Sequence, residues 1–348
     1  MTRVKLDAQF KTATVQSLTL FARGFFDPQA AVPRLPVLEM MLARGDTRIL
    51  KSLDADRWLC QRFAVGAGHD DPIASLTLLG AGTDPGNEFC MCADPVHLQV
   101  RHERLILVSA REIALREFES RKLADALDEH FATDGLRFTY VSPSRWCVRA
   151  GNPGRLVTQP LQTARGRDID ALLPRGEDAG YWMRIATEAQ MLLHAHPVNA
   201  AREERGEAPV NAIWLWGGGR LPRSATDFDA FAGADPVGRS LAMLSNLQTG
   251  SHAADLVTTI RAQSAQRMLV LLAPADGDSA SDALRSLERN WIAQAWAALR
   301  TDVVRQLRFA CELPSGMLEC TVNGRAAWRV WRRPRSIASL LESPQPDA

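Results

Sequence analysis

Excess charge, cysteine and long apolar runs are all scarce in this chain, and each scarcity excludes a class of protein. Its 348 residues carry 41 lysines and arginines against 40 aspartates and glutamates, a net charge of +1. Bulk charge therefore favours neither nucleic acid nor a membrane surface as a partner, and any anion site must be local. No run reaches the ~20 apolar residues of a membrane span, and residues 1–10 contain no apolar stretch typical of a secretion signal. We expect a cytoplasmic protein that does not bind membranes.

The cysteines are too few and too irregularly spaced for a disulfide framework. They are Cys60, Cys90, Cys92, Cys147, Cys311 and Cys320. A chain of this length buries enough surface without disulfides, so we expect free thiols. Cys90 and Cys92 would lie on one face of a strand, but no second closely spaced pair is present to complete a tetrahedral zinc site. Zinc binding is therefore not predicted.

Apolar residues, by contrast, are abundant. They make up 46% of the chain, enough for two domains or one elaborated domain. Strand and helix patterns alternate near both ends of the chain. Predicted strands are 15–21 and 268–273, and predicted helices are 33–44 and 281–307, followed by a hairpin at 318–330. This alternation is typical of an α/β core.

The middle of the chain predicts a different arrangement. A hairpin is expected at 96–108, a helix at 110–131, and two strands at 136–140 and 146–149. We therefore expect a smaller α+β domain at 90–180, inserted into the α/β core. The core would comprise 1–89 and 181–335, with a central sheet flanked by helices, and 336–348 would be a flexible tail.

The most informative segment is 196–222, which combines a helix, a turn, a strand and several glycines. Pro197 suits the first turn of a helix and Gly206 its end, after which 212–216 predicts a buried strand. We interpret the next residues, Gly217, Gly218 and Gly219, as a flexible loop of the kind that binds ligands in open α/β sheets. Glycines after a strand are also common in ordinary turns. Neither a P-loop lysine nor the dinucleotide glycine spacing is present, so nucleotide binding is not predicted.

Arginines near these glycines could hold a carboxylate or phosphate through paired hydrogen bonds. The alternative is that they are surface arginines on a short helix and loop. The candidate anion-binding residues are Asn199, Arg202, Arg205, Gly217, Gly218, Gly219 and Arg220. The expected partner is then a small anionic ligand or another protein.

A set of residues in this segment also carries a resemblance to a known family. The set is His196-Pro197-Val198-Asn199, Arg202, Arg205-Gly206, Pro209, Asn211-Ala212-Ile213, Gly217 and Gly219. It resembles a segment of the archaeal-type cofactor-independent phosphoglycerate mutases, in the alkaline phosphatase superfamily, and looks most like the bacterial RpfE-type regulatory proteins. The resemblance implies an alkaline-phosphatase-like core. For active members it implies two divalent cations held by Asp and His, and a Ser that carries the phosphoryl group.

The chain departs from that family pattern at the expected metal ligands. The first ligand should be an Asp that ends the first strand, but Arg23 stands there, and an arginine of the family's segment is replaced by Trp216. No histidine follows His252. The remaining candidates for one weak Mg²⁺ or Mn²⁺ site are Asp27, Asp276 and Asp278. Because closely spaced acids after a strand usually form a solvated turn, we predict no cofactor.

Three functions follow from these observations. The leading prediction is a catalytically degenerate, phosphoglycerate-mutase-like protein with a regulatory or ligand-binding role, in control of virulence-factor or extracellular-product synthesis. The first alternative is a metal-dependent phosphatase or phosphotransferase with a rearranged site. The second is a nucleic-acid-binding regulator, whose basic and aromatic residues would be Arg325, Trp328, Arg329, Trp331, Arg332, Arg333 and Arg335. In a hairpin these residues would form an ordinary half-buried edge strand, so a nucleic-acid partner is not expected.

Overall fold

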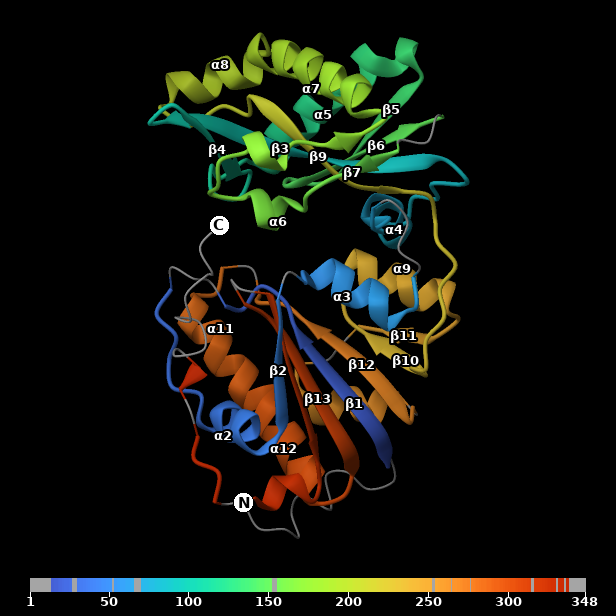
Figure 1. Cartoon of the computed structure of the whole chain (residues 1–348), viewed down its shortest axis with the longest axis vertical. Helices are drawn as coiled ribbons and strands as arrows, with labels where there is room; N and C mark the ends of the chain where they lie inside the picture. Colours follow the sequence, from blue (N-terminus) through green and yellow to red (C-terminus); the bar gives the residue numbers. More distant parts are fainter. Residues whose placement is uncertain are drawn as a thin grey trace. The chain divides into compact units, whose positions relative to one another are not determined.

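Two compact units make up the chain. One comprises Met1–Ala64 with Ser224–Ala348, and the other comprises Val65–Arg223 (Figure 1). The computed structural model describes residues 14–26, 30–51, 53–65, 70–151, 155–251, 254–263, 265–275, 277–313, 316–329, 331–334 and 336–337. The first unit is therefore discontinuous in sequence, and the second is inserted into it.

The first unit is built on one sheet, which has seven strands within the described residues, in the order β11-β10-β12-β1-β13-β14-β2. The strands are β1 (Val15–Ala22), β2 (Asp46–Lys51), β10 (Ala230–Ala232), β11 (Gln248–Gly250), β12 (Arg267–Leu272), β13 (Val304–Leu313) and β14 (Gly316–Asn323). β1 pairs in parallel with β12 and β13, and β10 pairs in parallel with β11 and β12. β14 is antiparallel to both of its neighbours, β13 and β2. The carboxyl ends of the parallel strands thus meet at one edge of the sheet.

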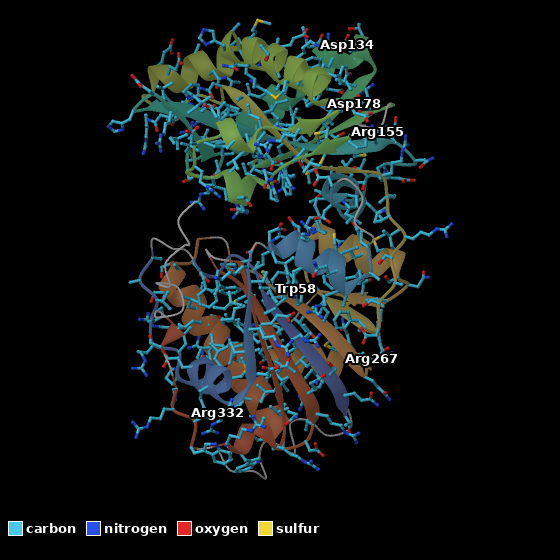
Figure 2. The ribbon with its side chains drawn as sticks, viewed as in Figure 1. Trp58, Asp134, Arg155, Asp178, Arg267 and Arg332 are labelled. Atoms are coloured by element: carbon cyan, nitrogen blue, oxygen red, sulfur yellow. The ribbon has the colours of Figure 1, made fainter. Side chains whose placement is uncertain are left out.

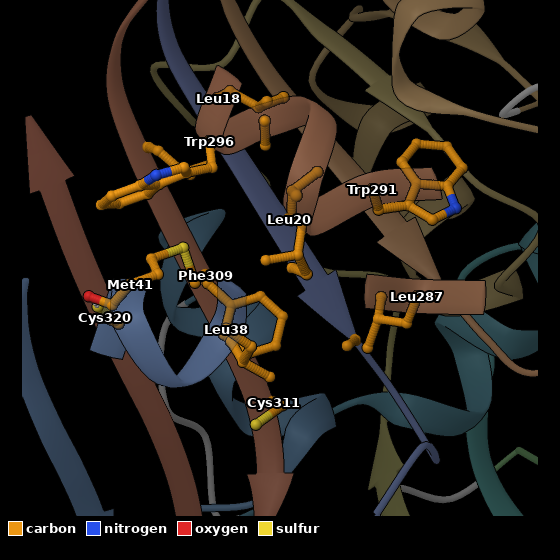
Figure 3. Close-up of a cluster of buried hydrophobic side chains, with 14 of the residues drawn as sticks. Leu18, Leu20, Leu38, Met41, Leu287, Trp291, Trp296, Phe309, Cys311 and Cys320 are labelled. Carbon is orange, nitrogen blue, oxygen red and sulfur yellow. Dashed lines mark hydrogen bonds between the residues drawn. The ribbon is translucent and has the colours of Figure 1, made fainter. Parts of the chain in front are cut away.

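Helices pack against both faces of this sheet. They are α2 (Pro36–Arg44), α3 (Ala55–Arg62), α9 (Pro236–Leu244), α10 (Leu256–Ala262), α11 (Ala280–Leu287) and α12 (Ala293–Arg300). Leu18 and Leu20 share a face of β1 because strand residues two apart point the same way. They belong to one buried cluster with Leu38 of α2, Phe309 of β13 and Trp296 of α12 (Figure 3). Each fully buried leucine contributes about 1.5–3 kcal/mol to folding, so this cluster anchors β1 at the centre of the sheet.

The predicted helix at 281–307 is wrong in its last turns. α11 and α12 are joined by a π-helical turn at Glu288–Ile292, and α12 ends at Arg300. Asp302 then adopts a φ of +63°, a left-handed conformation that aspartate tolerates better than most residues, and the chain enters β13. The predicted hairpin at 318–330 is also wrong, because β14 ends at Asn323 and pairs with the preceding strand, β13.

The second unit is an α+β structure. Its larger sheet has the order β4-β3-β6-β5, and β9 also pairs with β3. The strands are β3 (Phe89–Arg101), β4 (Arg104–Ser109), β5 (Leu136–Ser142), β6 (Arg145–Ala150) and β9 (Ala212–Gly219), with a separate pair of β7 (Leu156–Val157) and β8 (Arg175–Gly176). The helices are α4 (Ile73–Gly80), α5 (Glu117–Phe131), α6 (Leu161–Ala164), α7 (Ala179–His194) and α8 (Pro197–Glu204). Leu123 and Leu127 of α5 share a buried cluster with Trp182 of α7 and Leu215 of β9.

The predicted fold class, an α/β core with a central sheet flanked by helices and a smaller inserted α+β domain, is confirmed. The insert is longer than the expected 90–180, because the division falls at Val65 and Arg223. α4 precedes the expected boundary, yet it contacts β3 and β9. β9 follows the expected end, yet it is antiparallel to β3. Hydrogen bonding of β9 to β3 therefore draws 181–223, including the informative segment, into the inserted unit.

No helix among the residues that the structure describes combines the length and apolar character needed to cross a bilayer.

Candidate functional site

Arg23 follows β1 directly and lies among carboxylates from other segments of the first unit. Its Nη1 is 2.7 Å from Asp56 Oδ1 and 2.9 Å from Asp235 Oδ2. Asp56 lies in the first turn of α3, Asp235 caps α9 after β10, and Glu312 lies in β13, which pairs with β1. The sheet order explains this meeting, since β1, β10 and β13 are parallel and their carboxyl ends share an edge. This edge is where ligands of open α/β sheets usually bind.

The electrostatics of this cluster keep the guanidinium charged. Burial by itself lowers the pKa of Arg23, but the charges of Asp56, Asp235 and Glu312 together raise that pKa well above its usual value. Burial raises the pKa of Glu312, and the nearby Arg23 opposes that shift. Glu312 Oε2 also accepts a hydrogen bond of 3.1 Å from the backbone N of Gly24. A permanent cation of the protein itself therefore balances the negative charge at this edge.

The described residues do not fit the two-metal site that the family resemblance implies. A guanidinium contacts the oxygens of Asp56 and Asp235 that would otherwise be free to coordinate a cation. Among the described residues, no three His, Cys, Asp or Glu side chains are arranged to hold a metal ion. Of the predicted ligands, Asp278 is exposed in the turn before α11, whereas Asp27, Asp276 and His252 lie outside the described residues. A metal site with Asp278 stays a prediction.

The three glycines after Trp216 do not form the flexible loop that we predicted, because they continue β9. Gly219 is still paired with Cys90 of β3. A Cβ atom on Gly219 would lie 2.6 Å from the Cβ and 2.9 Å from the Cα of Pro72. Gly217 has a φ of +64°, a left-handed conformation that favours glycine. The glycines thus serve the close approach of another segment of the second unit to β9.

That segment brings a carboxylate to the glycine amides. Asp70 Oδ2 accepts hydrogen bonds from the Thr158 hydroxyl and, at 3.4 Å, from the backbone N of Gly218. Thr158 Oγ1 in turn accepts a hydrogen bond of 3.0 Å from the backbone N of Gly217. Burial raises the pKa of Asp70 to about 6, although these hydrogen bonds favour its charged form. The amides that we predicted would hold an external anion therefore face an anion of the chain itself.

Asn199 and Arg202 are buried, and their polar atoms are engaged within the protein. Asn199 Nδ2 donates to the carbonyls of Leu193 and Val210, both at 2.7 Å, and its Oδ1 accepts from Val210 N at 2.9 Å. Arg202 is 0% exposed, and its Nη1 lies 2.6 Å from Glu119 Oε2. These contacts argue against the predicted anion-binding role, because burial and internal hydrogen bonds close both side chains to a ligand. They tie α8 to α5 and to the start of β9.

The other predicted anion-binding arginines differ from each other. Arg205 is partly exposed, and its Nη2 lies 2.5 Å from Glu119 Oε1 and 2.7 Å from Glu207 Oε2. Arg220 follows β9 and has no ion pair within the part of the chain that the structure describes. Of the predicted anion-binding arginines, only Arg220 thus keeps a charge that no described carboxylate neutralises.

Trp216, at the position where the family resemblance implies an arginine, contacts a buried ion pair that the sequence did not reveal. Its Nε1 donates to Asp94 Oδ2 at 2.8 Å, and the guanidinium of Arg145 lies 4.7 Å from the centre of its ring. Arg145 Nε is 2.9 Å from Asp94 Oδ1, and Asp94 is 0% exposed. β6 therefore supplies a cation beside Trp216. The one available signal was a carboxylate, Asp94, in an otherwise apolar strand.

The remaining predicted candidates are not brought together. All six cysteines are buried and none forms a disulfide, and burial raises the pKa of Cys90 to about 12, which disfavours a reactive thiolate. Trp328 and Trp331 are 56% and 73% exposed, and Arg300 lies 4.5 Å from the ring centre of Trp328. These tryptophans lie beyond the β13–β14 hairpin, and Arg335 lies outside the described residues. The nucleic-acid surface stays a prediction.

Comparisons with known proteins agree on one family. The chain is 28% identical over 210 residues to a 2,3-bisphosphoglycerate-independent phosphoglycerate mutase of Methanosarcina mazei, covering 55% of this chain and 49% of that protein. It is 34% identical over 117 residues to a probable enzyme of the same name from Geobacter sulfurreducens, covering 32% of this chain and 29% of that protein. No family model matches the chain.

The solved structure of the PH0037 protein from Pyrococcus horikoshii has the same fold. It has a TM-score of 0.51 at 11% identity, covering 90% of this chain and 88% of that one. The matched region spans about half the length of the first curated relatives. In sequence, the chain is thus similar over about half of its length to 2,3-bisphosphoglycerate-independent phosphoglycerate mutases.

Proposed function

We propose that this protein is a catalytically degenerate relative of the phosphoglycerate mutases that binds a ligand or partner in a regulatory role. The observation that carries the proposal is the contact of Arg23 with Asp56 and Asp235. A divalent cation needs oxygen lone pairs that are free and a local charge that is negative. Arg23 engages the oxygens with hydrogen-bond donors and adds a positive charge that repels a metal ion.

One residue change in each of the two units supports this proposal. In the first unit a guanidinium stands where β1 should deliver the first metal ligand. In the second unit Trp216 stands in place of an arginine of the family, and its neighbour Arg145 is already paired with Asp94. Both changes remove chemistry needed for phosphoryl transfer, while the cores of both units are retained. Loss of chemistry with retention of fold is expected of a protein selected for binding. The resemblance to RpfE-type proteins suggests that the regulated process is virulence-factor or extracellular-product synthesis.

The competing function is a phosphomutase or phosphatase with a rearranged metal site, because the relatives carry the name of a mutase. Asp278 is the described residue on which such a site would depend. The test is metal analysis of the purified protein, followed by assays of phosphoglycerate interconversion and phosphomonoester hydrolysis with Mn²⁺. We expect neither stoichiometric metal nor turnover. Stoichiometric metal, with turnover that is lost in Asp278→Ala, would overturn the proposal.

A further inference from the structure

Two cavities on the sheet of the first unit share one arginine, Arg308. One cavity has a volume of about 260 Å³ and the other of about 340 Å³. The first is lined by Gln16, Ser17, Asp227, Phe228, Arg267 and Gln306, together with Arg308. The second is lined by Asp46, Arg48, Arg62, Glu319 and Thr321, again with Arg308. Arg267, which lines the first cavity, is labelled in Figure 2. A charged side chain thus stands between two hollows lined with hydrogen-bonding groups.

The strand pattern explains why Arg308 faces away from the main core. Leu307 and Phe309, its neighbours in β13, both belong to the buried cluster beneath the helices. Because successive strand residues point to opposite faces, Arg308 lies on the other face of the sheet. Gln16 and Ser17 lie at the start of β1, whereas Arg23 follows the end of the same strand. The cavities are therefore separate from the Arg23 cluster.

Arg308 is the cation of these cavities without a partner. Its guanidinium makes no hydrogen bond or ion pair within the part of the chain that the structure describes. The other arginines are paired: Arg48 with Asp46 at 2.8 Å, Arg62 with Glu319, and Arg267 with Asp229 at 3.0 Å. Glu319 Oε1 also accepts a hydrogen bond of 2.7 Å from Trp58 Nε1. The guanidinium of Arg308 is thus left without an ion pair, although Asp227, an acid of the first cavity, acts on it from beyond ion-pair distance.

The surroundings of Arg308 disfavour that charge in the free protein. Burial, and then the neighbouring charge of Arg62, lower the pKa of Arg308, while the charges of Glu319 and Asp227 oppose the shift. A half-buried guanidinium that is repelled by a neighbouring cation and forms no ion pair does not stabilise the fold through its charge. Such a residue is characteristic of a binding site, where stability is reduced for function.

Unpaired polar atoms next to Arg308 also indicate a missing partner. Thr19, which pairs with Arg308 in the register of β1 and β13, is 0% exposed, and its Oγ1 has no hydrogen-bond partner. Arg62 Nε is likewise buried without a partner. Buried polar groups are nearly always hydrogen-bonded, so unsatisfied groups beside an unpaired guanidinium call for an explanation.

We propose that a small anion with a phosphate or carboxylate group binds to Arg308 between the two cavities. A guanidinium presents two parallel N–H donors that match the oxygens of either group. Ser17, Gln306 and Thr321 are neutral residues of the lining that can hydrogen-bond the rest of the ligand without adding negative charge. This proposal is independent of the proposed loss of catalysis at Arg23, because the cavities lie toward the start of β1 and Arg23 follows its end.

The test compares three proteins by isothermal titration calorimetry at constant ionic strength. They are the full chain, Arg308→Gln, and the control Arg305→Gln, which changes an exposed arginine of the same strand. The probes are inorganic phosphate and succinate. We expect one-to-one binding of at least one probe to the full chain and to the control. Binding to Arg308→Gln should be about tenfold weaker or more, since a charge-assisted hydrogen-bond pair is lost.

The outcomes separate the two ligand groups and can overturn the proposal. Binding of phosphate alone identifies a phosphate site, and binding of succinate alone identifies a carboxylate site. Equal binding to all three proteins, or no binding of either probe to the full chain, overturns the proposal. Arg308→Lys keeps the charge but loses the paired donors, so weaker binding by this variant supports the proposal even if Arg308→Gln folds poorly.

Discussion

Two ion-paired arginines, one in each unit, show how differently the same side chain can be used. Arg202 of the second unit is 0% exposed and pairs with a carboxylate and backbone carbonyls of its own unit, so it joins α8 to α5. Arg23 of the first unit is 22% exposed and pairs with two carboxylates at the edge where parallel strands end. Arg202 belongs to the segment that carries the family resemblance, whereas Arg23 lies far from that segment, after β1. The comparison teaches that the recognisable segment reports packing, whereas the charged cluster at the edge of the sheet lies outside it.

The largest effect should come from Arg202→Ala. Removing this arginine leaves Glu119 without its one fully buried partner and leaves two backbone carbonyls without their donor, which should lower the free energy of unfolding by about 3–5 kcal/mol. Urea denaturation at pH 7 measures the change. The matched control is Arg205→Ala, which removes a partly exposed pair to the same Glu119 and should have a much smaller effect, because water screens that pair. If both substitutions lower the free energy of unfolding equally, burial does not make Arg202 more important to stability than Arg205.

Arg23→Ala should have a smaller effect, of about 2–3 kcal/mol, because water can reach the carboxylates that it leaves behind. Asp56, Asp235 and Glu312 would then repel one another without a cation. Lowering the pH protonates carboxylates and relieves that repulsion, so the loss of stability should be smaller at pH 5 than at pH 7. Unfolding curves at the two pH values test this. A loss that does not depend on pH would show that Arg23 acts through packing and not through charge.

Gly219→Ala tests whether the glycines of the second unit are structural. The new Cβ would lie within 3 Å of two atoms of Pro72, one of them in the backbone, so we expect a loss of about 1–2 kcal/mol. The control is Gly151→Ala, where a Cβ meets nothing within 4 Å. Thermal unfolding compares the two variants. If Gly219→Ala is as stable as the control, the close approach of Pro72 does not explain the glycine.

Local patterns predicted much of the fold but little of the candidate site. A short apolar segment predicted β1, and proline and glycine predicted both ends of α8, where Gly206 adopts a φ of +72°. The antiparallel pairing of β9 with β3 was not predictable, because a continuous apolar run fits a parallel and a buried antiparallel strand equally well. The Arg23 cluster joins residues up to 289 positions apart, so only the sheet order brings it together. Arg308 has no motif, since its significance lies in the partner that it lacks.

An effect no larger than that of Gly219→Ala concerns Asp70, whose titration makes the stability of the second unit depend on pH. Burial raises the pKa of Asp70 in the folded state to about 6 from an ordinary value of 3.8, so the folded state holds the proton more tightly than the unfolded state does. The stabilisation is therefore complete below the ordinary pKa and is lost as the pH rises through about 6. We expect a decrease of about 1–2 kcal/mol between pH 4 and pH 7, a shift of two units reduced for partial exposure. Asp70→Asn cannot ionise and should lack this decrease, whereas Asp84→Asn, at an exposed turn, should retain it. The Asp70 carboxylate accepts a hydrogen bond from the Gly218 amide. If the pH dependence is the same in all three proteins, Asp70 does not titrate as expected, and the glycine amides are again candidates for binding an external anion.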